Sequence, residues 1–193
     1  MFWNGAVPFV PQDSSKEEYV KHLNDNTLVS ILDDVKAKAG DVFFLETGTV
    51  HAIGAGLVIA EIQQTSDITY RLYDFDRVDA QGNTRELHVD LALEAINYDV
   101  VESHKKYDTV SNQSNAVVDC PYFTTNFLPL EDKLGVSKSG ETFTVYMCIE
   151  GSFEIEFNDF KQTYKKGDTV LVPAEINTFI LNGKASILEI YIS

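Results

Sequence analysis

Apolar residues recur at helical spacing in three segments of the chain. The first segment follows Ser14 and Ser15, which have the character of a helix N-cap before an acidic first turn. The second covers residues 28–35, and the third covers residues 87–97 (LHVDLALEAIN). This spacing predicts three short helices, all in the first half of the chain.

Short apolar or alternating runs, which are typical of strands, make up most of the remaining chain. In the first half they cover residues 41–45, 47–53, 57–64 and 69–75, and a turn is predicted at 80–83. Beyond residue 98 the helical signal disappears. The expected strands there are TVYMCIEG, SFEIEFND, FKQTYKKGD, TVLVPAE, NTFILNGK and ASILEIYIS. The first two, Val145–Ile149 and Phe153–Phe157, are predicted to form a hairpin within an antiparallel barrel or sandwich.

One short motif occurs twice: GDVFFL at residues 40–45 and GDTVLV at residues 167–172. A histidine, His51, follows the first copy only. We interpret the repeat as two related β-units. The expected domains are residues 1–98, with the helices and the candidate site, and residues 99–193, a second β-unit.

The composition excludes some functions. The formal net charge is −15, from 30 acidic and 15 basic residues. A nucleic-acid or anionic-membrane binder needs a basic face, so both classes are disfavoured. The two cysteines, Cys120 and Cys148, lack a disulfide-framework spacing and are expected to be reduced, with Cys148 in the core. Without a signal-peptide pattern or a long apolar segment, we expect a cytoplasmic protein.

Candidate chemistry gathers in residues 40–77. His51 follows a tight turn, and Glu61 and Gln63 share one face of the next expected strand, because alternate strand residues point the same way. An imidazole facing carboxylates suits a metal. The alternative is a turn histidine satisfied by backbone hydrogen bonds.

Two arginines in the same stretch suit an anionic ligand. The guanidinium groups of Arg71 and Arg77 offer bidentate donors that match phosphate or carboxylate. The alternative is pairing with nearby acids such as Asp67 and Asp74. Glu61 and Asp67 are then either general acid–base groups or partners that hold the arginines.

This stretch resembles the type I phosphomannose isomerases (mannose-6-phosphate isomerases) of the short bacterial class. The matching elements are GDVFFL, GTVHAIG, EIQQ, SDITYRLYDFDR and NTRELH, and the later GDTVLVPA resembles the family's second, metal-free barrel. The resemblance implies a mainly β fold of cupin-type (RmlC-like jelly-roll) units, the first one incomplete, with a small helical segment.

The resemblance also implies an activity. Mannose 6-phosphate and fructose 6-phosphate would interconvert by proton transfer between C1 and C2 through an enediol, with a zinc ion orienting the sugar oxygens. The implied site residues are His51 for the metal, Arg71 and Glu61 for catalysis, and Arg77, Asp67 and Gln63 for the phosphorylated hexose.

The family's other metal-ligand strands have no match in residues 1–39, so we expect the N-terminal portion of the family to be missing. Glu46, Glu61 or a partner chain would then have to complete the zinc shell. Three hypotheses follow: an active isomerase, a non-catalytic cupin remnant that binds a sugar phosphate, and the C-terminal piece of a split enzyme. From the ligand count we expect little or no isomerase activity. Open strand edges in the first unit predict a homodimer or a partner chain.

Overall fold

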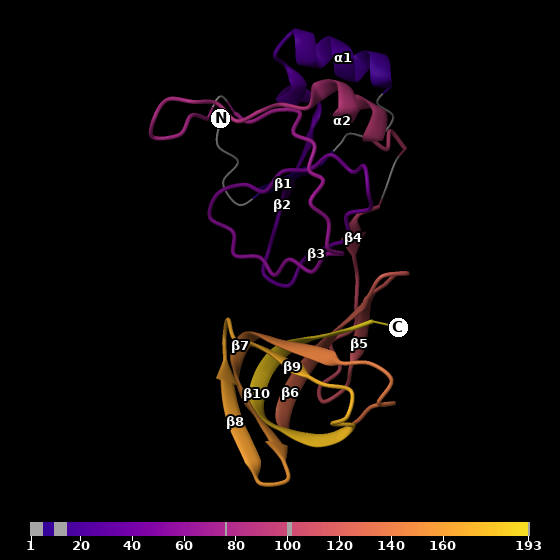
Figure 1. The fold of residues 1–193 in the computed structure, drawn as a ribbon, viewed down its shortest axis with the longest axis vertical. Coiled ribbons are helices and arrows are strands. Elements are labelled where there is room, and N and C mark those ends of the chain that lie inside the picture. Colours follow the sequence, from indigo (N-terminus) through magenta and orange to yellow (C-terminus); the bar gives the residue numbers. More distant parts are fainter. Residues whose placement is uncertain (1–5, 10–14, 76, 100–101, 193) are drawn as a thin grey trace. The chain divides into compact units, whose positions relative to one another are not determined.

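The computed structural model describes residues 6–9, 15–75, 77–99 and 102–192. The chain forms two compact units, Met1–His104 (unit 1) and Lys105–Ser193 (unit 2), as Figure 1 illustrates. Strand residues make up 39% and helical residues 11%. The prediction of a mainly β chain with a small helical segment is therefore confirmed.

Unit 1 contains two α-helices, α1 (Lys16–Asn24) and α2 (Val89–Ala95). Both were predicted. The N-cap of α1 is Ser15, whose hydroxyl accepts a hydrogen bond from the Glu18 N–H at 3.2 Å while the Glu18 carboxylate accepts from the Ser15 N–H at 3.0 Å. This reciprocal capping box satisfies two amide donors at the helix end. Ser14 lies outside the described residues. No helix in the described ranges is long and apolar enough to cross a membrane.

The second predicted helix, at residues 28–35, is wrong beyond its first turn. A short 3₁₀ helix, η1, spans Leu28–Ile31, and the chain then forms strand β2 (Asp33–Lys36). Strand β2 pairs antiparallel with β1 (Ala6–Phe9). Strand pairing therefore overrides helical spacing, because a pattern of this length is compatible with either structure until a partner is present.

Most of the strands predicted in residues 41–75 are absent. Only β3 (Val42–Phe43) forms, and it pairs with β4 (His104–Lys105). No described residue forms a strand ladder with residues 57–75, and Val58 is 98% exposed. Strand propensity mainly reflects packing against neighbouring strands, so the sequence pattern alone does not create a strand.

The core of unit 1 lies where α1, η1 and α2 meet. Tyr19, Leu28, Leu72 and Ala92 are buried there. Leu72 belongs to the segment that also carries Arg71 and Asp74. The core therefore anchors the segment that holds the candidate site, although this segment is not a strand.

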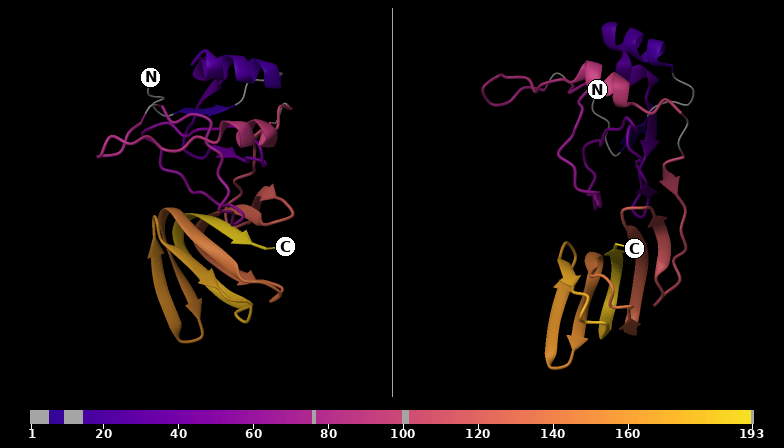
Figure 2. Two further views of the ribbon diagram at one scale, coloured as in Figure 1. Left: turned by 45° about the horizontal axis from the view of Figure 1, so that its top comes forward. Right: turned by 45° about the vertical axis from the view of Figure 1, so that its right-hand side comes forward.

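Unit 2 is a curved antiparallel sheet, seen from two further sides in Figure 2. Its strand order is β5–β6–β10–β7–β8, and β9 pairs with β7. The strands are β5 (Asn115–Asp119), β6 (Thr124–Ser137), β7 (Thr144–Phe157), β8 (Phe160–Lys165), β9 (Thr169–Val172) and β10 (Thr178–Tyr191).

The predicted hairpin between Val145–Ile149 and Phe153–Phe157 is wrong, because both segments belong to the single strand β7. The pairing of β7 with β10 shifts by one residue between Ser186 and Ile187. Gly151 has a φ of +75°, so the chain bends there without reversing. A bulge and a glycine can bend a long strand without ending it. In the sequence, the same glycine resembles a turn between two shorter strands.

The core of unit 2 lies on the inward face of the three long strands. Leu128 on β6 pairs with Ile187 on β10, and Ile187 pairs with Cys148 on β7. All three side chains are at most 1% exposed. The prediction that Cys148 is a core residue is confirmed.

The repeated motif forms the same turn in both units. Gly40 and Gly167 both have a φ of +92°, a conformation that favours glycine. The following aspartate accepts a hydrogen bond from the backbone N–H of the lysine three residues earlier, at 2.7 Å for Asp41 and 2.9 Å for Asp168. The two copies therefore share turn geometry as well as sequence.

We predict that Gly151→Ala destabilises unit 2 far more than Gly167→Ala. A Cβ atom on Gly151 would lie 2.2 Å from the Lys184 carbonyl oxygen, whereas one on Gly167 would meet nothing within 4 Å. Gly167→Ala should cost about 1–2 kcal/mol through its positive φ alone, and Gly151→Ala more than about 4 kcal/mol. Urea unfolding followed by the β-sheet circular dichroism signal measures both. Equal losses would contradict this account of the bend.

Candidate functional site

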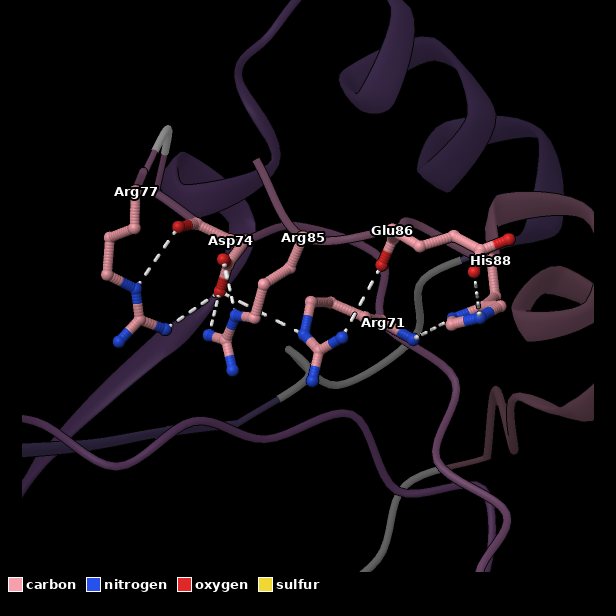
Figure 3. A network of polar contacts seen from close by, with 6 residues as sticks. All are labelled: Arg71, Asp74, Arg77, Arg85, Glu86 and His88. Carbon is pink, nitrogen blue, oxygen red and sulfur yellow. Dashed lines mark hydrogen bonds and ion pairs between the residues drawn. The ribbon is translucent and has the colours of Figure 1, made fainter. Parts of the chain in front are cut away.

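Three arginines surround one buried carboxylate in unit 1, Asp74 (Figure 3). The Asp74 side chain is 8% exposed. Arg85 holds it in a bidentate grip, with Nε donating to Oδ2 at 2.8 Å and Nη2 donating to Oδ1. Arg77 Nη2 donates to Oδ1 at 2.8 Å. A buried carboxylate requires paired charge, so these contacts explain how Asp74 is tolerated beside the core.

Arg71 is the arginine that Asp74 engages least. Its Nε lies 3.9 Å from Asp74 Oδ1, and its Nη1 donates a long hydrogen bond of 3.4 Å to the Glu86 carbonyl oxygen. Its backbone is fixed by His88, whose N–H donates to the Arg71 carbonyl at 2.8 Å and whose Nδ1 accepts from the Arg71 N–H at 3.4 Å. Arg71 is therefore held in place by its backbone, while much of its guanidinium hydrogen-bonding capacity remains for a ligand.

Arg85 was missed by sequence reasoning, although a usable signal was present. The predicted turn at residues 80–83 exists: the Asp79 N–H donates to the Asn83 carbonyl at 2.9 Å, and Val78 pairs antiparallel with Thr84. A chain that reverses there brings Arg85 back beside Arg77. The turn and the arginine spacing together would have placed Arg85 in the cluster.

The cluster shifts the protonation of its members. The pKa of Asp74 is lowered mainly by the hydrogen bond from Arg85, with further contributions from Arg77, and burial opposes the shift. The pKa of Arg85 is raised by the same hydrogen bond. Asp74 is therefore a carboxylate and the arginines are cationic at neutral pH. Three positive charges around one negative charge leave a local excess of positive charge.

His51 lies on an exposed turn of unit 1. The Thr49 N–H donates to the Glu46 carbonyl at 3.0 Å, and the Asn97 N–H, just beyond α2, donates to the Gly48 carbonyl at 3.0 Å. The Thr49 carbonyl lies 2.9 Å from His51 Nδ1. A carbonyl oxygen can only accept a hydrogen bond, so Nδ1 carries the proton. This leaves the lone pair on Nε2, as in many metal-binding histidines.

The residues around His51 fit one zinc ligand but do not fit a complete zinc shell. A structural or catalytic zinc site needs at least three protein ligands. No group of three or more His, Cys, Asp and Glu side chains that could hold a metal exists among the described residues. Neither Glu46 nor Glu61 forms such a group with His51.

Glu61, Gln63 and Asp67 are exposed in the irregular segment 57–70. In the described part of the chain, no hydrogen bond or ion pair joins them to the arginine cluster. The cluster therefore unites Arg71 and Arg77 of the predicted site residues and adds Asp74 and Arg85. The functional assignments of the six predicted residues stay predictions.

We predict that Asp74→Asn destabilises unit 1 at neutral pH and that this effect fades in acid. The folded-state pKa of Asp74 lies below the unfolded value of about 3.9. The stabilisation is therefore fully present above that value and is lost as the pH falls through the folded-state pKa. Urea unfolding between about pH 3 and pH 7, followed by the helical signal of α1 and α2, measures the difference.

The matched control is Glu131→Gln, which removes a carboxylate that is 49% exposed. Its effect should be small across the same pH range. A difference between wild type and Asp74→Asn that persists unchanged to the lowest pH would contradict the proposed charge pairing.

The chain is similar in sequence to known mannose-6-phosphate isomerases. Residues 112–192 match the family described as "Mannose-6-phosphate isomerase, cupin domain". The chain is 35% identical to mannose-6-phosphate isomerase ManA of Bacillus subtilis over 178 residues, which cover 89% of this chain and 55% of the relative. It is 29% identical to the mannose-6-phosphate isomerase of Streptococcus mutans over 181 residues, with 90% and 55% covered.

The fold is similar over nearly the whole chain. The crystal structure of the mannose 6-phosphate isomerase from Bacillus subtilis matches with a TM-score of 0.87 at 30% identity, covering 97% of this chain and 60% of that one. The chain thus spans little more than half the length of the relatives it matches. By sequence and fold the chain is similar to mannose-6-phosphate isomerases over nearly its whole length, and residues 112–192 match the cupin domain of that family.

Proposed function

We propose that this chain contributes the cationic side of a sugar-phosphate site, as part of mannose 6-phosphate and fructose 6-phosphate interconversion. The observation that carries the proposal is the excess of guanidinium charge around Asp74. Its relatives of similar sequence are named mannose-6-phosphate isomerases.

The charge balance supports binding of an anion. The chain as a whole has a net charge of −15, so a cluster in which cations outnumber anions contrasts with its overall charge. Asp74 fixes the orientation of Arg77 and Arg85 before a ligand arrives, which lowers the entropy cost of binding. Arg77 and Arg85 are 61% and 51% exposed, so both can still be reached from solvent. A phosphate group is a suitable partner for guanidinium donors arranged in this way.

The proposed roles follow the chemistry of each side chain. Arg77 binds the phosphate, and Arg71 donates to the oxygens on C1 and C2, where negative charge develops as the enediol forms. Glu61 moves the proton between these carbons. Gln63 and Asp67 bind sugar hydroxyl groups. This arrangement requires segment 57–70 to close over the ligand.

His51 is proposed as one zinc ligand, through Nε2. Zinc would supply polarisation of the sugar oxygens when bound. The described residues do not fit a complete zinc shell, so the proposed roles in proton transfer and binding belong to the side chains of this chain. A second copy or a partner chain is the proposed source of further ligands.

The alternative function is sugar-phosphate binding without catalysis. One imidazole cannot hold zinc against water and cellular chelators, and this ligand count favours the alternative for the chain on its own. We therefore propose that the chain alone binds the phosphorylated hexose and turns it over slowly or not at all.

We predict that Arg71→Gln and Arg77→Gln each weaken the binding of mannose 6-phosphate. Each removes charge-assisted hydrogen bonds to the ligand, so the affinity for mannose 6-phosphate should fall about 10- to 100-fold. Isothermal titration calorimetry measures it. Lys161→Gln is the matched control, because Lys161 is also an exposed cation paired with a carboxylate, Glu156 in unit 2. Loss of affinity in this control alone would sink the proposal.

The activity prediction concerns the unmodified chain with added zinc. A coupled assay that detects fructose 6-phosphate from mannose 6-phosphate should show little or no turnover, and elemental analysis should find far less than stoichiometric zinc. Robust turnover by the pure chain would overturn the non-catalytic alternative and favour the active isomerase. His51→Ala should then abolish both the activity and the bound metal.

A further inference from the structure

Unit 2 contains a cavity of about 470 Å³ that the arginine cluster does not involve. It opens on the inward faces of β6, β7 and β10 and is also lined by residues 137–139 and by Asn112 and Ser114. Small-molecule sites in proteins typically occupy about 300–1,000 Å³. The size of the cavity therefore fits a small ligand.

A row of three polar side chains forms one wall of this cavity. Glu189 on β10 pairs directly with Asn126 on β6 and with Tyr146 on β7. Asn126 Nδ2 donates to Glu189 Oε2 at 3.0 Å, and the Tyr146 hydroxyl donates to Oε1 at 2.9 Å. Asn126 is 7% and Tyr146 1% exposed. Two buried side chains on neighbouring strands therefore fix the orientation of the Glu189 carboxylate.

This row borders an apolar face. The next inward row is Leu128, Ile187 and Cys148, which packs as core. An apolar residue at position 189 would continue that packing without the cost of desolvating a carboxylate. A carboxylate also has about four lone-pair sites, and the two donors of the row use only part of that capacity. Glu189 thus retains acceptor capacity on the side of the cavity.

The cavity's charge restricts the class of ligand. Its lining contains one lysine, Lys138, whose ammonium group donates to the carbonyl oxygens of Thr142, Val172 and Pro173 at 3.2, 3.1 and 2.9 Å. An ammonium group has three donors, so Lys138 has none left for an anion. Among the lining residues, Glu189 is then the charged group with hydrogen-bonding capacity left for a ligand, and its carboxylate disfavours a phosphate group placed beside it.

The remaining lining suits a ligand with many hydroxyl groups. Ser137, Ser139, Thr142 and Thr144 offer hydroxyls that both donate and accept, and Tyr191 offers a ring. Sugar hydroxyls can donate to Glu189 and accept from these groups. We propose that this cavity binds an unphosphorylated sugar or polyol, with Glu189 as the central acceptor and Asn126 and Tyr146 as its positioning residues.

The first test uses the full chain and needs no variant. Nuclear magnetic resonance spectra are recorded while D-mannose (a ring) or D-mannitol (an open chain) is added. The side-chain amide signal of Asn126 and the backbone signals of Glu189 and Tyr146 should shift and saturate with at least one probe. No shift with either probe, up to its solubility, overturns the proposal.

The second test compares variants by calorimetry with the probe that binds. Glu189→Gln keeps the shape of the side chain but loses its charge, and affinity should fall at least about tenfold. Ser139→Trp fills the mouth from an exposed position and should abolish binding while the fold remains. Glu131→Gln, on an exposed carboxylate of β6, should leave affinity unchanged. Unchanged affinity in both cavity variants overturns the assignment.

Addition of mannose 6-phosphate distinguishes binding in the cavity from binding at the arginine cluster. It should shift signals of unit 1 arginines and leave the Asn126 amide unmoved. If it binds at Asn126 more tightly than mannose does, the conclusion that the cavity takes a neutral ligand is wrong. That result would leave the arginine proposal to be judged on its own variants.

Discussion

The pairing register of β6, β10 and β7 is the constraint on which unit 2 depends. Strand side chains alternate between the two faces of a sheet, so one register decides every inward residue at once. It aligns Leu128, Ile187 and Cys148 into a core row. The same register also aligns Asn126, Glu189 and Tyr146, which lie two residues away on each strand, into a polar row on the same face. The core and the candidate cavity therefore share one structural cause.

The two units stabilise a carboxylate in opposite ways. Asp74 is surrounded by cations, which leaves a surplus of positive charge for an anionic ligand. Glu189 is held by neutral donors, which leaves its negative charge in place for hydroxyl donors. Hydrogen bonds from guanidinium groups lower the pKa of Asp74. The pKa of Tyr146 is raised mainly by burial and further by the negative charge of Glu189. We therefore propose different ligand classes for the two carboxylates: an anion beside Asp74 and a hydroxyl-rich neutral molecule beside Glu189.

The sequence predicted well what depends on neighbouring residues and poorly what depends on distant partners. The Ser15 cap, the repeated turn at Gly40 and Gly167 and the turn at residues 80–83 are local, and all are present. The hairpin at Val145–Phe157 failed because a bulge and Gly151 resemble a turn in sequence but only bend a strand. Residues 57–75 failed as strands because no described strand pairs with them. Arg71 and Arg77 were found through their chemistry, whereas Arg85 needed the geometry of the chain reversal.

We propose that Asp74 organises arginines that recognise a phosphorylated hexose. Nuclear magnetic resonance of isotope-labelled arginine Nε–H groups tests it most directly, during addition of mannose 6-phosphate to the full chain. We expect the signals of Arg71 and Arg77 to shift and saturate together, and we expect Asp74→Asn, at a temperature where this less stable variant is still folded, to weaken the response. Arginine signals that stay unmoved in the wild-type chain would contradict it.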